Sequence, residues 1–291
     1  MKPPAFAYHD PRSVDEAIAL RAAHGFDSVF LAGGQSLMPM LAIRLAKPEV
    51  LIDVNRIDDI KQVSWDGDLL EIGAGVRQHA IETDEQVKAR IPLLHTMTQF
   101  IGHVENRHRG TVGGSIAHAD PSAELPLAAV TLDAELVIQG KNGTRTETAT
   151  DFFTGWMSTS LDEDEMLTMV RFPASKEGSS WGFWEVSRRD GDFAMASGAA
   201  QLTLASNGTV ESASIGVGGV TDHPVRAREV EQALVGRQPT PDAVAEAAEA
   251  IRDAVTIPDD MHATADYRRH LATVVTARAV NGAVKRAAKG Q

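Results

Sequence analysis

Two glycine pairs about eighty residues apart constrain this chain more than any other feature of its sequence. They lie in Ala32-Gly33-Gly34-Gln35-Ser36 and Thr111-Val112-Gly113-Gly114-Ser115, and each follows or opens a segment predicted to belong to a sheet. Paired glycines let the backbone turn through positive φ and present bare N–H groups to an anion, while neighbouring hydroxyl groups add donors without charge. Two such turns can grip one diphosphate, although either pair alone is also typical of an ordinary turn.

Neither glycine pair fits the common nucleotide-binding patterns. The dinucleotide fingerprint G-x-G-x-x-G and the P-loop pattern G-x-x-x-x-G-K-[ST] are both missing from the sequence. Ser36 is not surrounded by the Gly-x-Ser-x-Gly elbow of a hydrolase nucleophile, which disfavours a hydrolase. The two pairs therefore call for a different diphosphate-binding fold.

Charge and cysteine content exclude several classes of function. The 291-residue chain has a formal net charge of −12 and no basic stripe of the kind that nucleic-acid binding requires. It has no cysteine, so it can carry neither a disulfide nor a thiolate-bound zinc or iron–sulfur centre, and any such centre must belong to a partner. No signal peptide and no apolar run of about 20 residues is found, which gives a cytoplasmic location as the default expectation.

Local signals predict alternating helices and strands in the first half of the chain. Ser13 is predicted to cap a helix, with Glu16 reaching back and Gly25 ending it. Apolar runs predict strands at residues 28–32 and 50–54. An Asp-Gly pair at residues 66–67 and an Asn-Gly pair at residues 142–143 predict two hairpins. Helical spacing over residues 81–102, broken by a proline, predicts helices ahead of the second glycine pair.

A change of composition around residues 173–180 predicts a domain boundary. Beyond it the pattern predicts a small sheet backed by helices, which is an α+β arrangement. The expected strands are residues 181–186, 199–204 and 212–216, and the expected helices are residues 225–234, 241–255 and 265–288.

The residues around both glycine pairs resemble the FAD-binding medium subunit of molybdenum hydroxylases, the family of xanthine dehydrogenase and aerobic carbon monoxide dehydrogenase. The resemblance covers essentially the whole chain, and its most specific segments are residues 31–39, 110–121, 151–155, 165–173 and 188–194. It implies an α+β protein built from a vanillyl-alcohol-oxidase-like (PCMH-type) FAD-binding domain of two α/β subdomains, followed by a small α+β domain with a three-stranded antiparallel sheet and helices. The expected ranges are 1–55, 56–176 and 177–291, the last of the carbon monoxide dehydrogenase flavoprotein type.

The resemblance also implies which residues contact FAD. Both glycine loops wrap its diphosphate, and the helix beginning near Met38 can add its positive N-terminal end. An acidic residue at the position of Glu124 lies near ribityl or ribose hydroxyls in the family, and a pair matching Met166 and Leu167 packs against the isoalloxazine, with Trp184 near a further flavin-adjacent position. The cofactor-binding set is Ala32, Gly33, Gly34, Gln35, Ser36, Thr111, Gly113, Gly114, Ser115, Asp120, Glu124, Met166 and Leu167.

Several polar residues allow other interpretations. His118 beside Asp120 can be imagined as a hydrolytic dyad or a metal site, and a loop role is the alternative. His103 and His108 have the spacing of a metal pair but lack a third ligand. No catalytic and no metal-binding residue is therefore predicted.

Arg107 and Arg109 precede the second glycine pair. They can offset the charge of a diphosphate or form a solvated basic turn, and both readings stay open.

The predicted function is that of an electron-transfer flavoprotein subunit. The resemblance implies a dimer of heterotrimers in which a large molybdopterin subunit hydroxylates the substrate and a small subunit passes electrons through iron–sulfur clusters. FAD in this chain then hands the electrons to an external acceptor. The alternatives are a stand-alone FAD-dependent oxidoreductase and a non-catalytic scaffold subunit.

Overall fold

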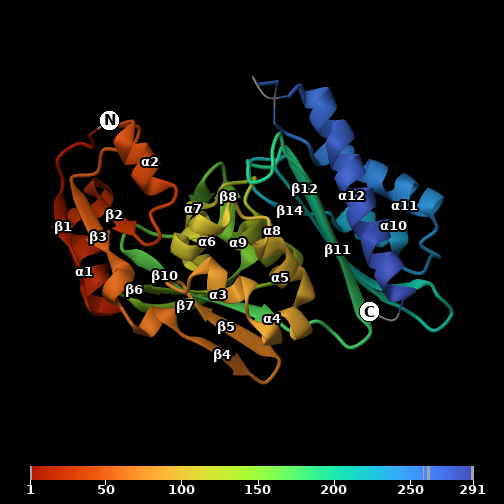
Figure 1. The fold of residues 1–291 in the computed structure, drawn as a ribbon, viewed down its shortest axis with the longest axis horizontal. Coiled ribbons are helices and arrows are strands. Elements are labelled where there is room, and N and C mark those ends of the chain that lie inside the picture. The colour runs from red at the N-terminus through yellow and green to blue at the C-terminus, as the bar shows by residue number, and fades with distance from the viewer. Residues whose placement is uncertain (1, 258, 261–262, 290–291) are drawn as a thin grey trace.

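The computed structural model describes residues 2–257, 259–260 and 263–289. Three larger sheets follow one another along its long axis, each with its own helices (Figure 1). They lie within residues 7–53, 63–173 and 179–226. Whether the ranges 1–55, 56–176 and 177–291 fold as separate units stays a prediction. Within the described ranges, no helix is long and apolar enough to cross a membrane.

The first sheet is small and parallel, with the strand order β1-β3-β2. The Ser13 hydroxyl accepts a hydrogen bond from Glu16 N at 3.2 Å and caps α1, as predicted, whereas the Glu16 carboxylate accepts from the backbone N–H of Arg12 at 2.8 Å. Gly25 ends the helix at φ +51°. The elements are β1 (Ala7–His9), α1 (Val14–His24), β2 (Ser28–Leu31), α2 (Leu37–Ala42) and β3 (Val50–Asp53).

The second sheet is antiparallel and holds five strands in the order β4-β5-β10-β6-β7. Both predicted hairpins are confirmed, since β4 pairs with β5 and β6 with β7. These strands are β4 (Val63–Asp66), β5 (Leu69–Gly73), β6 (Glu135–Gly140), β7 (Gly143–Thr148) and β10 (Glu165–Pro173), with a separate pair β8 (Phe153–Gly155) and β9 (Ser158–Thr159).

Seven short helices accompany the second sheet. Pro92 starts α5, because proline fits the first turn of a helix better than its interior. The helices are α3 (Gln78–Glu82), α4 (Glu85–Arg90), α5 (Pro92–Thr98), α6 (Val104–Arg109), α7 (Val112–His118), α8 (Glu124–Thr131) and α9 (Ala149–Phe152).

The third sheet is antiparallel and is crossed on one face by the long helix α12 (Ala265–Ala287) (Figure 1). The three predicted strands are present, and the two-residue strand β14 adds a fourth. The helix expected over residues 225–234 is therefore wrong at its start, because Val225 pairs with Val217. The remaining elements are β11 (Ser179–Val186), β12 (Ala196–Leu204), β13 (Val210–Gly218), β14 (Val225–Arg226), α10 (Arg228–Leu234) and α11 (Pro241–Ala248), the last continuing as a 3-10 turn over Glu249–Ala254.

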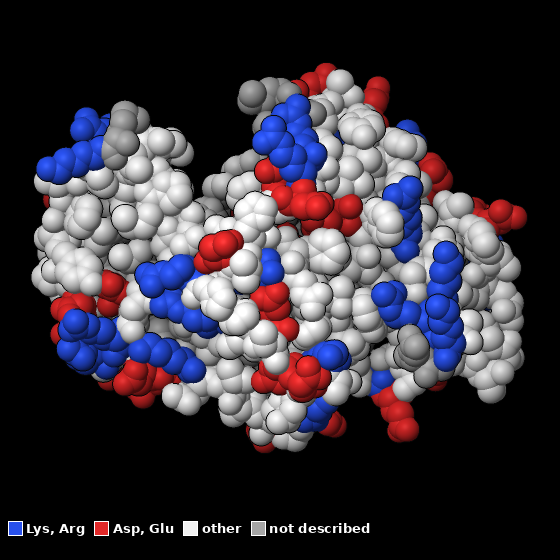
Figure 2. All heavy atoms as spheres, in the orientation of Figure 1, with Lys and Arg blue, Asp and Glu red and all other residues white. Residues whose placement is uncertain are grey.

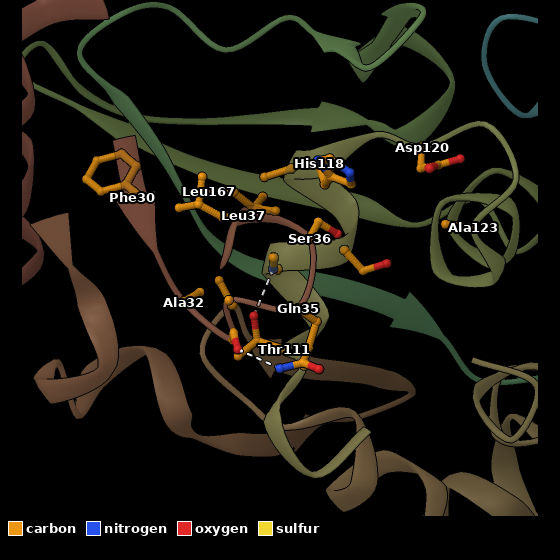
Figure 3. Close-up of a pocket in the computed structure, with 18 of the residues that line it drawn as sticks. Phe30, Ala32, Gln35, Ser36, Leu37, Thr111, His118, Asp120, Ala123 and Leu167 are labelled. Atoms are coloured by element: carbon orange, nitrogen blue, oxygen red, sulfur yellow. Dashed lines mark hydrogen bonds between the residues drawn. The ribbon is translucent and has the colours of Figure 1, made fainter. Parts of the chain in front are cut away.

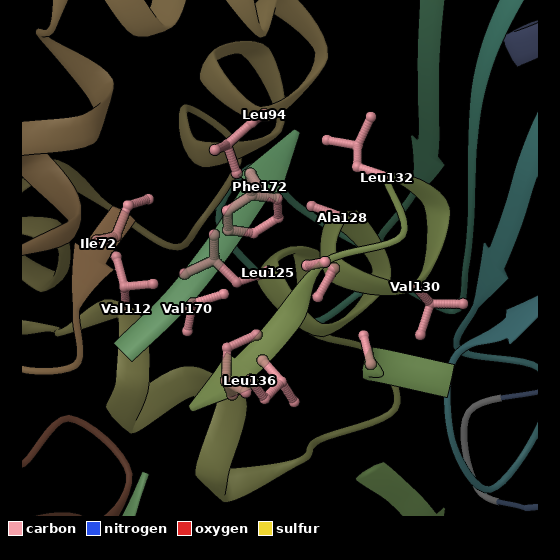
Figure 4. Packing of buried hydrophobic residues seen from close by; sticks show 14 of the residues in the cluster. Ile72, Leu94, Val112, Leu125, Ala128, Val130, Leu132, Leu136, Val170 and Phe172 are labelled. Atoms are coloured by element: carbon pink, nitrogen blue, oxygen red, sulfur yellow. The ribbon is translucent and has the colours of Figure 1, made fainter. Parts of the chain in front are cut away.

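The largest hydrophobic core lies between the second sheet and its helices (Figure 4). Ile72 and Phe172 enter it from strands, and Leu94, Val112 and Leu125 enter it from α5, α7 and α8; all five are fully buried. The helix that carries the second glycine pair is thus anchored on this core through its first residue.

Candidate functional site

A cavity of about 740 Å³ lies between the first sheet and the helices α7 and α8. On the face shown in Figure 2, the molecule is hollowed between the N-terminal part and the rest, and acidic and basic side chains are interspersed. A volume of this size is typical of a small-molecule site. All thirteen residues of the predicted cofactor-binding set line the cavity, although they come from sequence segments as far apart as residues 32 and 167.

The first glycine pair makes the predicted turn at the end of β2. Gly34 has φ +72°, a conformation that favours glycine. The side chain of Asn55 donates to Ala32 O at 2.8 Å, and Gln35 donates to Gly33 O at 3.2 Å. These bonds hold the turn beside the cavity.

The second glycine pair does not make a turn, which corrects the prediction. Gly113 and Gly114 lie inside the first turn of α7, and neither has positive φ. Thr111 caps this helix by accepting the Gly114 N–H on its hydroxyl at 3.0 Å. Gly113 serves close packing instead, because a Cβ there would lie 2.3 Å from the Cβ of Ala74.

The two glycine pairs lie side by side despite their separation in sequence (Figure 3). A Cβ on Gly33 would lie 2.4 Å from Arg109 O and 2.7 Å from Gly110 Cα, in the residues just before the second pair. Asn106 donates to the Gln35 side-chain oxygen at 3.0 Å and links the same two segments. Ser36 and Ser115 line the cavity beside the two glycine pairs, where their hydroxyls can serve a ligand.

One end of the cavity holds a group of apolar side chains, with Arg21 over the Phe30 ring and Glu163 acting on Arg21, and the other end holds Asp120 and Glu124. Phe30, Leu37 and Leu167 lie together at one end, and Asp120 lies near Ala123 at the other (Figure 3). Met166 and Leu167 come from β10 and are 5% and 4% exposed. Trp184 does not line the cavity; its ring lies 4.7 Å from the guanidinium carbon of Arg278.

The end of the cavity near Asp120 holds a largely buried carboxyl group. Glu124 is the first residue of α8 and only 8% exposed. Burial, together with the charges of Glu185 and Asp120, raises its pKa to about 8, and Arg107 offsets this only in part. Asp120 accepts the backbone N–H of Ser122 at 2.9 Å.

The structure also settles the roles of the neighbouring cations. Arg107 is buried and forms two hydrogen bonds with Glu82, at 2.9 and 2.8 Å, so it is neither a solvated basic turn nor a cavity residue. Arg109 is exposed, and its carbonyl accepts a hydrogen bond from Arg77.

The imagined histidine sites find no support. His103 caps α6 together with Asn106, and the ring of His108 lies tilted against that of His79, with the ring centroids 3.9 Å apart. His118 lines the cavity, but the described part of the chain contains no group of three or more His, Cys, Asp or Glu side chains able to hold a metal ion.

Further residues line the cavity that the sequence interpretation did not select. Three of them, Gly191, Asp192 and Phe193, belong to the segment 188–194. This segment carries the family resemblance, but the resemblance does not imply a contact with FAD for these three residues. Asn106 reaches the first glycine segment through its hydrogen bond to Gln35, and the side chain of Gln78 lies against Gly110. No local pattern marks these last two.

The residues present fit FAD on three structural grounds. The glycine segments pack closely and bring their backbone to the cavity, Ser36 and Ser115 add hydroxyls to its lining, and apolar side chains lie toward one end with Asp120 and Glu124 toward the other. An elongated molecule with a diphosphate near its middle suits this order.

Comparisons with known proteins agree with the fold and the cavity. Residues 4–175 match the model described as "FAD binding domain in molybdopterin dehydrogenase", and residues 181–283 match "CO dehydrogenase flavoprotein C-terminal domain". The chain is 37% identical to the caffeine dehydrogenase subunit beta of Pseudomonas sp. (strain CBB1), over 98% of this chain and 97% of that protein. It is also 37% identical to the carbon monoxide dehydrogenase medium chain of Hydrogenophaga pseudoflava, over 99% of this chain and all of that protein (100%).

A solved structure of carbon monoxide dehydrogenase from Hydrogenophaga pseudoflava, which lacks the Mo-pyranopterin moiety of the molybdenum cofactor, superimposes with a TM-score of 0.95. The two chains are 38% identical, and 98% of this chain and 99% of that one are covered. The likeness confirms the α+β fold class expected from the resemblance. The chain belongs to the FAD-binding medium subunits of the molybdenum hydroxylases.

Proposed function

We propose that this chain receives electrons from partner subunits on an FAD held in the cavity and passes them to an external acceptor. The observation that carries the proposal is the side-by-side placement of the two glycine pairs, with Gly33 packed on the backbone of Arg109 and Gly110. FAD, when bound, supplies a ring that accepts electrons one at a time and releases them in pairs. The protein supplies position and electrostatics.

Different groups of cavity residues are suited to different parts of FAD. Backbone N–H groups of the first glycine segment and the hydroxyls of Ser36 and Ser115 are suited to the diphosphate oxygens. The N–H groups of Gly113 and Gly114 are donated to Ala74 O and Thr111 Oγ1, so the second segment contributes close packing and its serine hydroxyl. Met166 and Leu167 offer an apolar surface to the isoalloxazine ring, and Asp120 and Glu124 offer oxygens to sugar hydroxyls. This assignment supports a binding role for all thirteen residues and gives none of them a catalytic role.

The partners are proposed from the family and from the missing cysteines. A small iron–sulfur subunit and a large molybdopterin subunit complete the assembly, as a dimer of heterotrimers. Because this chain has no cysteine, it cannot hold an iron–sulfur cluster by thiolates, and electrons must reach its flavin from another chain. A cytoplasmic location stays a prediction.

Co-purification tests this assembly. Under gentle conditions, tagged full chain from its native cells should bring down two further chains, one with iron–sulfur clusters and one with molybdenum. Metal analysis and mass spectrometry of the complex check both. A chain that purifies alone and oxidises a substrate without partners would contradict the proposal and favour a stand-alone flavin oxidoreductase.

A further inference from the structure

Three polar side chains lie where the third sheet meets α8: Glu124 and Ser197 are buried, and Glu185 is half-buried. Glu185 of β11 lies directly opposite Ser197 of β12 in the antiparallel register. Within the described ranges, Glu185 Oε2 and Ser197 Oγ are buried without a hydrogen-bond partner, and Ser197 is 1% exposed. Buried polar groups are normally paired, so these two require an explanation.

The alternation of side chains directs both residues toward α8. Gly198, the neighbour of Ser197, faces α12, because a Cβ there would lie 2.7 Å from Val275 O. Successive residues of a strand point to opposite faces, so Ser197 and its cross-strand partner Glu185 point away from α12. Gly218, opposite Ser197 on β13, confirms this direction: its Cβ would lie 3.0 Å from Ser197 Oγ and 3.1 Å from Pro121 O, just before α8.

Glu124, the first residue of α8, is the third member of this cluster, and its position at the cavity wall joins the cluster to the proposed cofactor site. The charged groups that act on Glu124 are Glu185, Asp120 and Arg107. Arg107 is engaged with Glu82, so no cation is committed to the two glutamates. His118 of α7 lines the same cavity.

Two largely buried carboxyl groups cannot both be ionised without a large cost when the nearby cation, Arg107, is engaged with Glu82. Burial raises the pKa of Glu185 to about 7, and burial together with the charge of Glu185 raises that of Glu124 to about 8.

We propose that the pair formed by Glu124 and Glu185 holds a proton on Glu124 at neutral pH and that this proton allows the cavity to retain FAD. The inference rests on the proposed function of the cavity. A protonated Glu124 can donate a hydrogen bond to an oxygen of the cofactor, whereas a carboxylate can only accept one. Full ionisation would add the charge of Glu124 to that of Asp120 in the wall of a cavity whose ligand has an anionic diphosphate, with the charge of Glu185 behind it.

The sign of the pH dependence follows from which form binds FAD. Protonation of the pair favours the complex, so the Kd for FAD rises as pH increases through the titration of the pair. One linked proton gives a slope of at most about tenfold per pH unit.

The test is a titration of the full chain with FAD from about pH 6 to about pH 9, followed by flavin fluorescence. The wild-type Kd should rise by about tenfold or more across this range. In E124Q/E185Q the Kd should not depend on pH, whatever its value. In E185Q alone the rise should move to lower pH, because Glu124 loses a neighbouring negative charge.

Glu211→Gln is the matched control. Glu211 is an exposed residue of β13 and does not line the cavity, so this variant should follow the wild type. A wild-type Kd that stays constant across the range, or that changes equally in E124Q/E185Q, would overturn the proposal.

An infrared titration of FAD-free chain separates this proposal from the proposed function. A carboxylic-acid C=O band should be present near neutral pH, disappear as pH rises and be missing from E124Q/E185Q. Absence of this band in the wild type overturns the proposed proton on Glu124. If no FAD binds at any pH, the proposed function fails instead, and the band still decides whether the pair holds a proton.

Discussion

Gly33→Ala should lower the affinity for FAD by about 5- to 150-fold. The new Cβ would lie 2.4 Å from Arg109 O, so the first glycine turn must move away from the second glycine segment. Binding then requires the two segments to come back together against an overpacking cost of about 1–3 kcal/mol. Gly33→Val should abolish measurable retention. Equilibrium titration with FAD, followed by flavin fluorescence, gives the Kd.

Gly282→Ala is the control for this substitution. Gly282 lies in α12, away from the cavity, and a Cβ there meets nothing nearer than 3.5 Å. Its FAD affinity should equal that of the wild type, and its stability should not fall, because alanine favours a helix over glycine. A folded Gly33→Ala chain with unchanged FAD affinity would refute the role of the paired segments in holding the diphosphate.

Arg107→Met should destabilise the chain by about 3–5 kcal/mol, because it leaves the carboxylate of Glu82 largely buried without its main cation. Arg107 also donates to the carbonyls of Ile101 and Gly102, at 3.0 and 3.2 Å, in the turn that leads into α6 and the second glycine segment. Urea denaturation of the full chain measures the loss. Arg109→Met, two residues away and exposed, is the control and should lie within about 0.5 kcal/mol of the wild type.

The same pair predicts a pH dependence with a definite sign. The hydrogen bonds from Arg107 hold the pKa of Glu82 below its ordinary value of 4.5 in the folded chain. The pair therefore stabilises the fold above that ordinary value, and its contribution is lost as pH falls through the lowered pKa. The stability gap between wild type and Arg107→Met should be full at neutral pH and narrow in acid. A gap that is equal at all pH values, or no larger than that of Arg109→Met, would contradict the importance of the pair.

The local features of the fold could be predicted from the sequence because they depend on neighbouring residues. The cap at Ser13 and the hairpins at residues 66–67 and 142–143 each involve a few adjacent side chains, and the structure contains all of them. Strand β14 was missed because Arg226 and Val225 pair with Gly216 and Val217 of β13, ten and eight residues away, and nothing in residues 225–226 marks them as a strand.

The second glycine pair shows a different limit of sequence interpretation. Glycine serves either positive φ or close packing, and the sequence does not distinguish these uses. At Gly34 the first applies, whereas at Gly113 the second applies, because α7 approaches Ala74 closely. The family resemblance still selected residues that share one cavity, since it depends on motif order rather than on the local conformation.

Contacts between distant segments lie beyond any local pattern. Asn106 reaches Gln35 across 71 positions, and Glu185 approaches Glu124 only because the third sheet packs on α8. These contacts determine which segments form the cavity wall and which charges lie near it. They depend on the folded chain and have no counterpart in the local sequence.

The most direct test of the central claim is the visible absorption spectrum of the purified full chain after incubation with FAD and removal of unbound cofactor. The same measurement applies to the co-purified assembly. We expect the bands of oxidised flavin, with about one FAD per chain, and loss of those bands in Gly33→Val. A folded wild-type chain that retains no flavin, alone and in its assembly, would contradict the account.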